Sequence, residues 1–283
     1  MKRAFLFQLM VLALLRLNAQ PGIEGIYIEQ YYCVTSQDLN DKHLIGDLEE
    51  GMCTYRIYLD LLPGYRFQAA YGTEKHPLVI KSNGLFYNHP EVGNTQPNLI
   101  PSRTLKNNVV LLDSWLTAGA AGENYLGVPR KFDNQGEIAF QKGFFKSTTK
   151  ESNLSFQECD GMYYRQFPSV PTFYQMDDAL KGLAAVSRTN TIELTNGAWA
   201  CMGKGAVGVD STGTNLVLIG QLTTKGNLEY SLNIMVGSPD GKSTKYVYDN
   251  AQDGEVALAF LKGNADAFTS KGVKKKKKNK KRN

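Results

Sequence analysis

Apolar and polar positions alternate with a period near two along much of the chain. The pattern is clearest where aromatic and β-branched residues occupy one phase, in residues 23–34, 53–61, 65–71 and 228–236. Successive side chains of a strand point to opposite faces, so this pattern predicts strands with one buried face. Similar stretches follow at residues 109–116, 136–140, 191–195, 216–223 and 245–248. The sequence therefore predicts a mainly β protein.

Short segments rich in Pro and Gly separate several of these strands. Hairpin turns are predicted at Leu62-Pro63-Gly64-Tyr65, Thr224-Lys225-Gly226-Asn227 and Ser238-Pro239-Asp240-Gly241. Helical spacing is confined to Gln175–Val186 and Glu255–Leu261. Frequent turns with little helix favour one large or two packed antiparallel β-sandwich-like units with one or two short helices.

A faint internal echo leaves the number of domains open. The only two tryptophans, Trp115 and Trp199, each begin a W-x-x-x-G motif, so two related halves with a boundary near residues 149–155 are one alternative. A single domain is the other. Both tryptophans are expected to anchor a core. We divide the chain into a signal peptide, a β-rich first half, a β-rich second half and a disordered polybasic tail, at residues 1–19, 20–150, 151–268 and 269–283.

The first 19 residues have the layout of a secretory signal peptide. Lys2 and Arg3 precede an apolar run, Ala4–Leu15, and the small residue Ala19 offers a cleavage site. The run is shorter than the roughly 20 residues that span a bilayer, so an uncleaved anchor is the lesser alternative. We expect a secreted protein, extracellular or associated with the cell surface, with a periplasmic location as the alternative.

Export changes the interpretation of the four cysteines, because an oxidising compartment favours disulfides. Four cysteines allow three connectivities. We favour Cys33–Cys53, since both lie in predicted strands that would be neighbours, and Cys159–Cys201 follows by elimination. Zinc is the rival interpretation, and it is disfavoured because the chain has no C-x-x-C motif and only three histidines.

The net charge of the chain is divided unevenly. There are 32 Lys and Arg against 27 Asp and Glu, but three cations lie in the leader and nine in residues 271–282, so 20 cations face 27 anions in the body. The tail should be disordered and attract polyanions in a salt-dependent way, through Lys274, Lys275, Lys276, Lys277, Lys278, Lys280, Lys281 and Arg282. Folding back on the acidic body, or a purely solubilising role, are the alternatives.

Several motifs occur in an order that resembles a known domain type. They are Thr54–Tyr58, Ala70–Gly72, His76–Leu78, Phe86–Asn88, Asn94-Thr95, Asp113–Gly119, Val217–Thr224 and Leu232–Ile234. Together they resemble an exported β-rich domain of uncharacterised function that recurs in secreted and surface proteins of marine and Bacteroidetes-type bacteria. The resemblance covers most of residues 23–236 and implies export, a β fold and surface association, with no catalytic residue or ligand. The basic tail departs from the sorting or anchoring segment that other members often carry.

Acidic loops suggest two kinds of chemistry. Asp249–Glu255 and the loop from Asp38 to Asp47 are candidates for a structural calcium ion, although Ala251 and Phe260 depart from an EF-hand. A glycosidase needs two carboxylates about 5 to 9 Å apart, and loop acids after Asp38 or around Asp177 are the candidates.

Aromatic pairs are a further candidate resource, because exposed rings stack on sugars, whereas buried rings only pack strands. The pairs are Tyr31-Tyr32, Phe86-Tyr87, Phe144-Phe145, Tyr163-Tyr164 and Phe173-Tyr174. His43, His76 and His89 lack a G-x-S-x-G nucleophile motif.

The sequence favours a secreted, non-enzymatic binding or surface/matrix protein, whose β body carries a polybasic tail for attachment to anionic polysaccharide or the envelope surface. The alternatives are a secreted polysaccharide-acting hydrolase that uses loop carboxylates, and a matrix component without a ligand. No motif of a sequence-specific nucleic-acid reader occurs, and we expect no transmembrane span in the mature chain. No catalytic residue is assigned, and no cofactor is expected apart from the structural calcium ion. The ligand and the oligomeric state are left open.

Overall fold

A computed structural model describes residues 21–40, 48–105, 109–134, 144–145, 160–166, 168–185, 187–201 and 203–265. This part of the chain is mainly β, as the alternation predicts, and its strands form four sheets. Sheet A contains, in spatial order, β1 (Ile23–Cys33), β2 (Cys53–Leu61), β13 (Asn215–Thr224) and β5 (Trp115–Leu116). Sheet D contains β6 (Ala120–Gly122), β7 (Tyr125–Gly127), β9 (Met162–Tyr164) and β8 (Phe144–Phe145).

Sheets B and C complete the strand inventory. Sheet B has the order β10 (Thr172–Tyr174), β12 (Gly197–Ala200), β3 (Arg66–Gly72), β15 (Ile234–Gly237), β16 (Ser243–Val247) and β17 (Glu255–Ala257). Sheet C has the order β11 (Thr191–Leu194), β4 (Leu78–Ser82), β14 (Leu228–Ser231) and β18 (Lys262–Asn264). All pairs in the four sheets are antiparallel except β16 with β17. All four sheets combine strands from both halves of the sequence.

The helices of the described part are short. The α-helices are α2 (Ser102–Leu105), α3 (Arg130–Asn134) and α4 (Asp177–Leu183), and the 3₁₀ turns are η1 (Asp38–Asn40), η2 (Pro97–Leu99), η3 (Val109–Leu112) and η4 (Ala259–Leu261). The helix predicted over Gln175–Val186 is confirmed as α4. Among the described residues no helix is long and apolar enough to cross a membrane.

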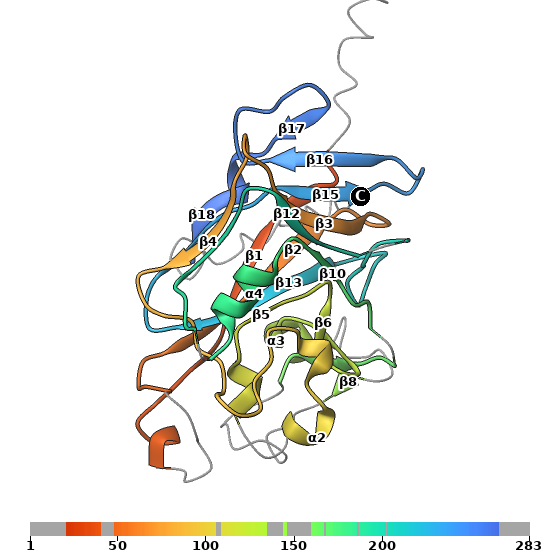
Figure 1. Ribbon diagram of the computed structural model, residues 1–283. Helices are drawn as coiled ribbons and strands as arrows, with labels where there is room; N and C mark the ends of the chain where they lie inside the picture. Colours follow the sequence, from red (N-terminus) through yellow and green to blue (C-terminus); the bar gives the residue numbers. More distant parts are fainter. Residues whose placement is uncertain are drawn as a thin grey trace, which may run out of the picture.

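Sheet A lies between two hydrophobic cores. In Figure 1 sheet B crosses the top, sheet A runs through the middle, and β6, β8, α2 and α3 lie below it. Alternation in β2 divides its side chains between the two faces: Ile57 and Leu59 enter core 1, toward sheets B and C, whereas Tyr58 enters core 2, toward η3 and sheet D. β13 is buried along its whole length, as expected for a strand covered on both faces.

Both tryptophans are core residues, as predicted. Trp199 lies on β12 in core 1, and Trp115 lies on β5 in core 2. Each is almost fully buried. The W-x-x-x-G echo therefore places its two tryptophans in different sheets and different cores.

Two of the three predicted hairpins are wrong. Leu62–Tyr65 connects β2 to β3, and Thr224–Asn227 connects β13 to β14, but in neither case do the two strands pair. Each turn instead carries the chain around a corner into another sheet, because turn residues specify a reversal but not the partner strand. Ser238–Gly241 does connect paired strands, β15 and β16.

Three further predictions of local structure need correction. Glu255–Leu261 is not a helix but β17 followed by η4, and residues 109–116 are η3 followed by the two-residue strand β5. Residues 228–236 form two strands in different sheets, β14 and β15, because Asn233 leaves the ladder and donates through its side chain to Tyr71 O and His76 O. The predicted strand over residues 136–140 lies outside the described residues.

Candidate functional site

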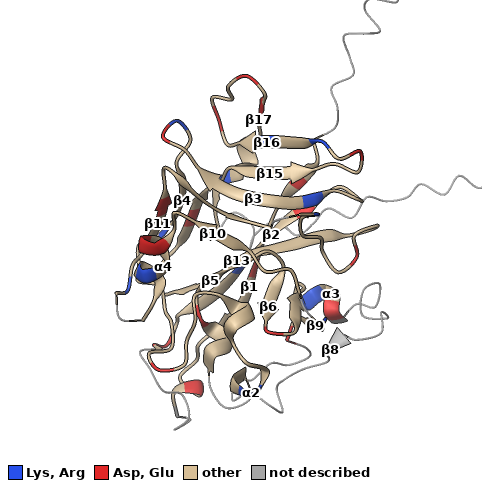
Figure 2. Ribbon diagram, turned by 45° about the vertical axis from the view of Figure 1, so that its right-hand side comes forward, with Lys and Arg blue, Asp and Glu red and all other residues tan. Residues whose placement is uncertain are grey.

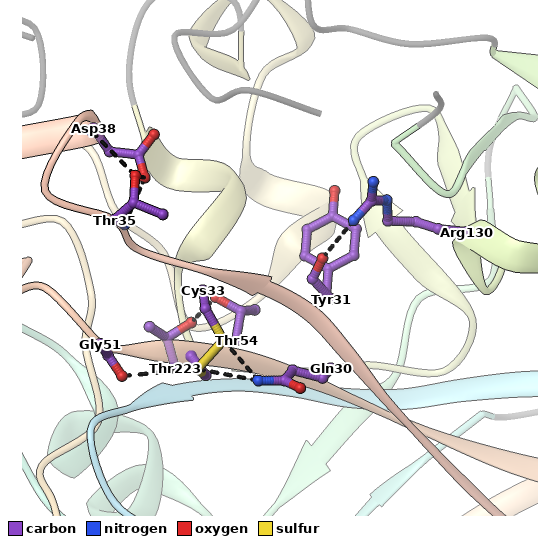
Figure 3. Close-up of a disulfide and its surroundings, with 10 residues drawn as sticks. Gln30, Tyr31, Cys33, Thr35, Asp38, Gly51, Thr54, Arg130 and Thr223 are labelled. Atoms are coloured by element: carbon purple, nitrogen blue, oxygen red, sulfur yellow. Dashed lines mark hydrogen bonds between the residues drawn. A yellow bond between two sulfur atoms is a disulfide. The ribbon is translucent and has the colours of Figure 1, made fainter. Parts of the chain in front are cut away.

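The predicted Cys33–Cys53 disulfide is present at the end of the β1–β2 ladder, where the two cysteines are direct cross-strand partners with Cα atoms 4.1 Å apart. Figure 3 shows the Gln30 amide beside the sulfur atoms; its Nε2 lies 2.7 Å from Cys33 Sγ and 3.3 Å from Cys53 Sγ. Behind the disulfide the Thr54 and Thr223 hydroxyls are hydrogen bonded at 2.6 Å. The disulfide thus links β1 and β2 covalently at the last residue pair of their ladder.

Several residues to which the sequence analysis assigns a role lie outside the described residues. Cys201 forms no disulfide with any residue that the structure describes, and burial raises the pKa of its thiol. Its predicted partner, Cys159, lies outside the described residues, so that pairing stays a prediction. The signal peptide and all the polyanion-binding residues of the tail also lie outside the described residues.

The described acidic side chains of the candidate loops stabilise local turns and a helix end. Asp38 accepts hydrogen bonds at 2.7 Å from both the backbone N–H and the hydroxyl of Thr35, and one at 2.8 Å from the Tyr32 hydroxyl. Asp177 and Asp178 are exposed in the first turn of α4, where negative charge favours the helix. Asp41 and Asp47 lie outside the described residues.

The second calcium candidate, Asp249–Glu255, is a closed turn. The Glu255 carboxylate accepts from Gln252 N at 2.9 Å, and its Oε2 lies 3.1 Å from Nε2 of the buried His76. Among the described residues no group of three or more His, Cys, Asp or Glu side chains gathers as a metal site would require.

The aromatic pairs divide by burial. Tyr31, Phe86 and Tyr87 are core residues. Tyr164 and Tyr174 are exposed, at the surface of sheets D and B. The side chains of Phe144 and Phe145 lie outside the described part of the structure.

One surface pocket differs in charge from the acidic body around it. It lies beside the start of β3 and the end of β15 and has a volume of about 480 Å³. Its lining residues are Gly64, Arg66, Gln68, Gly203, Lys204, Gly237, Ser238, Pro239 and Gly241. The two charged side chains among them are cations, so we call it the cationic pocket.

The strand register explains how the cationic pocket forms. Arg66 and Gly237 are cross-strand partners on β3 and β15. A Cβ atom at Gly237 would lie 2.7 Å from Gln68 Nε2, so a larger residue there would displace that amide. Phe67 bridges to Ala206 through two 2.8 Å backbone hydrogen bonds, and this bridge brings the turn containing Lys204 beside Arg66.

The two cations of this pocket are exposed and unpaired. Neither Arg66 nor Lys204 forms an ion pair with any residue that the structure describes. The nearest acid in sequence to the rim, Asp240, is paired with Lys242 at 3.0 Å. In the pocket floor, Gln68 Oε1 is buried without a hydrogen-bond partner in the described part of the chain. Figure 2 shows both signs of charge scattered over the rest of the ribbon, mostly at turns and strand ends.

Sequence reasoning did not find the cationic pocket. Alternation in β3 does predict that Arg66 points outward, but Lys204 follows from a long-range bridge that no local pattern encodes. No family model, curated protein or solved structure matches the chain. The resemblance to exported surface domains therefore stays an expectation.

Proposed function

We propose that this is an exported, non-enzymatic binding protein that attaches to anionic polysaccharide or envelope material. The observation that carries the proposal is a glycine-rich pocket in an otherwise acidic body. It holds two cations, Arg66 and Lys204, that form no ion pair with any described residue. An arginine side chain suits this role because its planar guanidinium binds carboxylate or sulfate oxygens through two parallel hydrogen bonds.

The shape of the cationic pocket supports the same function. Glycines at the rim leave the backbone open, so a bulky anionic group can approach both cations at once. Attraction of a surface cation to an anionic layer contributes about 1 kcal/mol, which is about fivefold in affinity per cation. Two cations alone give weak attachment.

The basic tail would supply most of the affinity. Its eight clustered cations, from Lys274 to Arg282, act on the same polyanion as the pocket, and linking two binding elements raises the effective concentration of each. In this account the tail attracts any polyanion. The cationic pocket favours a polymer whose anionic groups are spaced to reach both Arg66 and Lys204. The Cys33–Cys53 disulfide suits an oxidising location outside the cytosol.

The test is binding of the purified chain to dextran sulfate and to uncharged dextran, measured by titration calorimetry. We expect binding to the sulfated polymer only. Replacing the tail cations by glutamine weakens it strongly, and Arg66→Gln with Lys204→Gln weakens it by a further factor of about thirty.

The matched control is Lys225→Gln, which removes a lysine that is already paired with Glu49 at 2.8 Å and lines neither pocket. We expect it to leave the affinity for dextran sulfate unchanged. Equal binding to both polymers, or equal losses from Lys225→Gln and the pocket variants, would contradict the proposed function.

A further inference from the structure

A second open surface lies on the outer face of sheet C. A pocket of about 500 Å³ covers this face, and it shares no lining residue with the cationic pocket. In Figure 1 strands β4 and β18 of sheet C lie at the left, whereas the arrowhead of β15, beside the cationic pocket, points to the right. The two pockets are therefore separate surfaces.

Strand alternation makes the sheet C face polar. In β4, Leu78 and Ile80 enter the core, whereas Val79 is half-buried and Lys81 is exposed. The register extends this pattern across the sheet. It forms one row of Thr191, Lys81, Glu229 and Asn264 and a second row of Glu193, Val79, Ser231 and Lys262.

The charges on this face balance, unlike those of the cationic pocket. Two lysines and two glutamates line it, and Lys81 Nζ lies 3.1 Å from Glu229 Oε2. Both side chains of that pair are about half exposed, and such a surface pair contributes at most about 1 kcal/mol. A ligand hydroxyl, which both donates and accepts, can therefore replace the pair at little cost.

Tyr248 supplies an aromatic ring at the edge of this pocket. The ring is half-buried and meets the ring of His76 edge to face, with centroids 6.5 Å apart. Lys262 Nζ lies 5.3 Å from the centre of the Tyr248 ring, so a cation and an aromatic face border the same space. Tyr248 thus combines an apolar face with a polar tip at the end of two rows of hydrogen-bonding groups.

We propose that the sheet C face binds a neutral oligosaccharide. Sugar rings present an apolar C–H face that stacks on an aromatic ring and hydroxyls that need donors and acceptors in roughly equal number. The balanced lysines and glutamates match such a ligand and give no net attraction to a polyanion. The pocket is within the size range of small-molecule sites, about 300 to 1,000 Å³. The protein would then hold a charged polymer at one face and an uncharged glycan at another.

The experiment is titration of the full chain with four uncharged hexasaccharides: cellohexaose, xylohexaose, mannohexaose and maltohexaose. High salt suppresses binding through the tail and the cationic pocket, so this result is independent of the proposed function. We expect at least one hexasaccharide to bind in high salt. Failure of all four to bind would overturn the inference.

Substitutions of Tyr248 test whether the oligosaccharide binds at the sheet C face. Tyr248→Ala is expected to weaken binding about tenfold or more, because it removes the ring on which the sugar stacks. Tyr248→Phe keeps the ring and should retain most of the affinity even if the alanine variant folds poorly. Tyr174→Ala removes an exposed tyrosine of sheet B and serves as the control. Equal losses from Tyr248→Ala and Tyr174→Ala, or a loss with Tyr248→Phe as large as with alanine, would contradict the site.

Discussion

The guanidinium carbon of Arg56 lies 3.6 Å from the centre of the Tyr31 ring, and neither side chain is exposed to solvent. Arg56 Nε donates to Gln221 Oε1 at 2.8 Å, and its Nη1 donates to Gly161 O at 3.1 Å. On the neighbouring strand its cross-strand partner is Glu29, which is also buried. Arg56 and Glu29 therefore form a buried cross-strand pair on the core 2 face of sheet A.

Arg56→Ala should lower the free energy of unfolding by about 3–5 kcal/mol, because it removes the cation of this buried pair and leaves Gln221 Oε1 and Gly161 O without their donor. Urea unfolding followed by tryptophan fluorescence measures the loss. Arg66→Gln, at an exposed arginine, is the control and should change stability by less than about 0.5 kcal/mol. Similar values for the two variants would show that the buried pair does not stabilise core 2.

Loss of the disulfide should destabilise the fold, and the effects of the two single cysteine substitutions should not add in the double variant. Cys33 and Cys53 are 20 residues apart, so opening this loop is expected to lower the free energy of unfolding by about 3 kcal/mol. Cys33→Ser, Cys53→Ser and the double variant should all lose the same amount, because either substitution breaks the one bond. A double variant that loses the sum of the two would contradict this.

Gly72 marks the place where sheet B meets sheet C. A Cβ atom there would lie 1.8 Å from Leu194 O, so Gly72→Ala must push the two backbones apart. We expect a loss of about 1–3 kcal/mol in thermal or urea unfolding. Gly25→Ala is the matched control, because nothing lies within 4 Å of its added Cβ. Equal stability of the two variants would show that the corner is looser than the structure indicates.

The Asp113 carboxyl predicts a pH dependence of stability. Burial raises the pKa of Asp113 to about 8, even though its oxygens accept from His89 N at 2.7 Å and Asn94 N at 3.0 Å. Between pH 3.8 and about 8 the folded chain keeps a proton that the unfolded chain releases. The contribution of Asp113 is therefore complete at low pH and is lost as the pH rises toward 8, with a slope of at most about 1.4 kcal/mol per pH unit.

Asp113→Asn, which resembles the neutral carboxyl, should remove this part of the pH dependence. Urea unfolding of both proteins from pH 5 to 8 provides the comparison, and the parent should lose more stability than the variant as the pH rises. Parallel curves would mean that Asp113 is ionised in the folded state across this range.

Local patterns in the sequence predicted the strands but not their partners. Alternation found β2 and its two faces, yet nothing in Thr54–Tyr58 indicates that Arg56 is buried, because its compensating partners, Tyr31 and Gln221, come from β1 and β13. The same limit explains the two wrong hairpins, since sheet partners are chosen by long-range packing. The Cys33–Cys53 disulfide was predictable because both cysteines lie on strands that are consecutive in the chain.

The candidate site depends even more on long-range contacts. The cationic pocket joins Arg66 to Lys204 through the Phe67–Ala206 bridge, and Tyr248 reaches the face of sheet C from the end of β16. The polybasic tail, by contrast, is evident from composition alone.

The salt dependence of dextran sulfate binding by a chain whose tail cations are all glutamine tests the central claim most directly. With the tail neutralised, Arg66 and Lys204 should still give a logarithmic slope of about −0.7 to −0.9 for each cation engaged, by analogy with nucleic acids. Adding Arg66→Gln and Lys204→Gln should bring that slope to zero. A salt dependence of the tail-neutralised chain that survives both pocket substitutions would contradict the assignment of the body as a polyanion-binding surface.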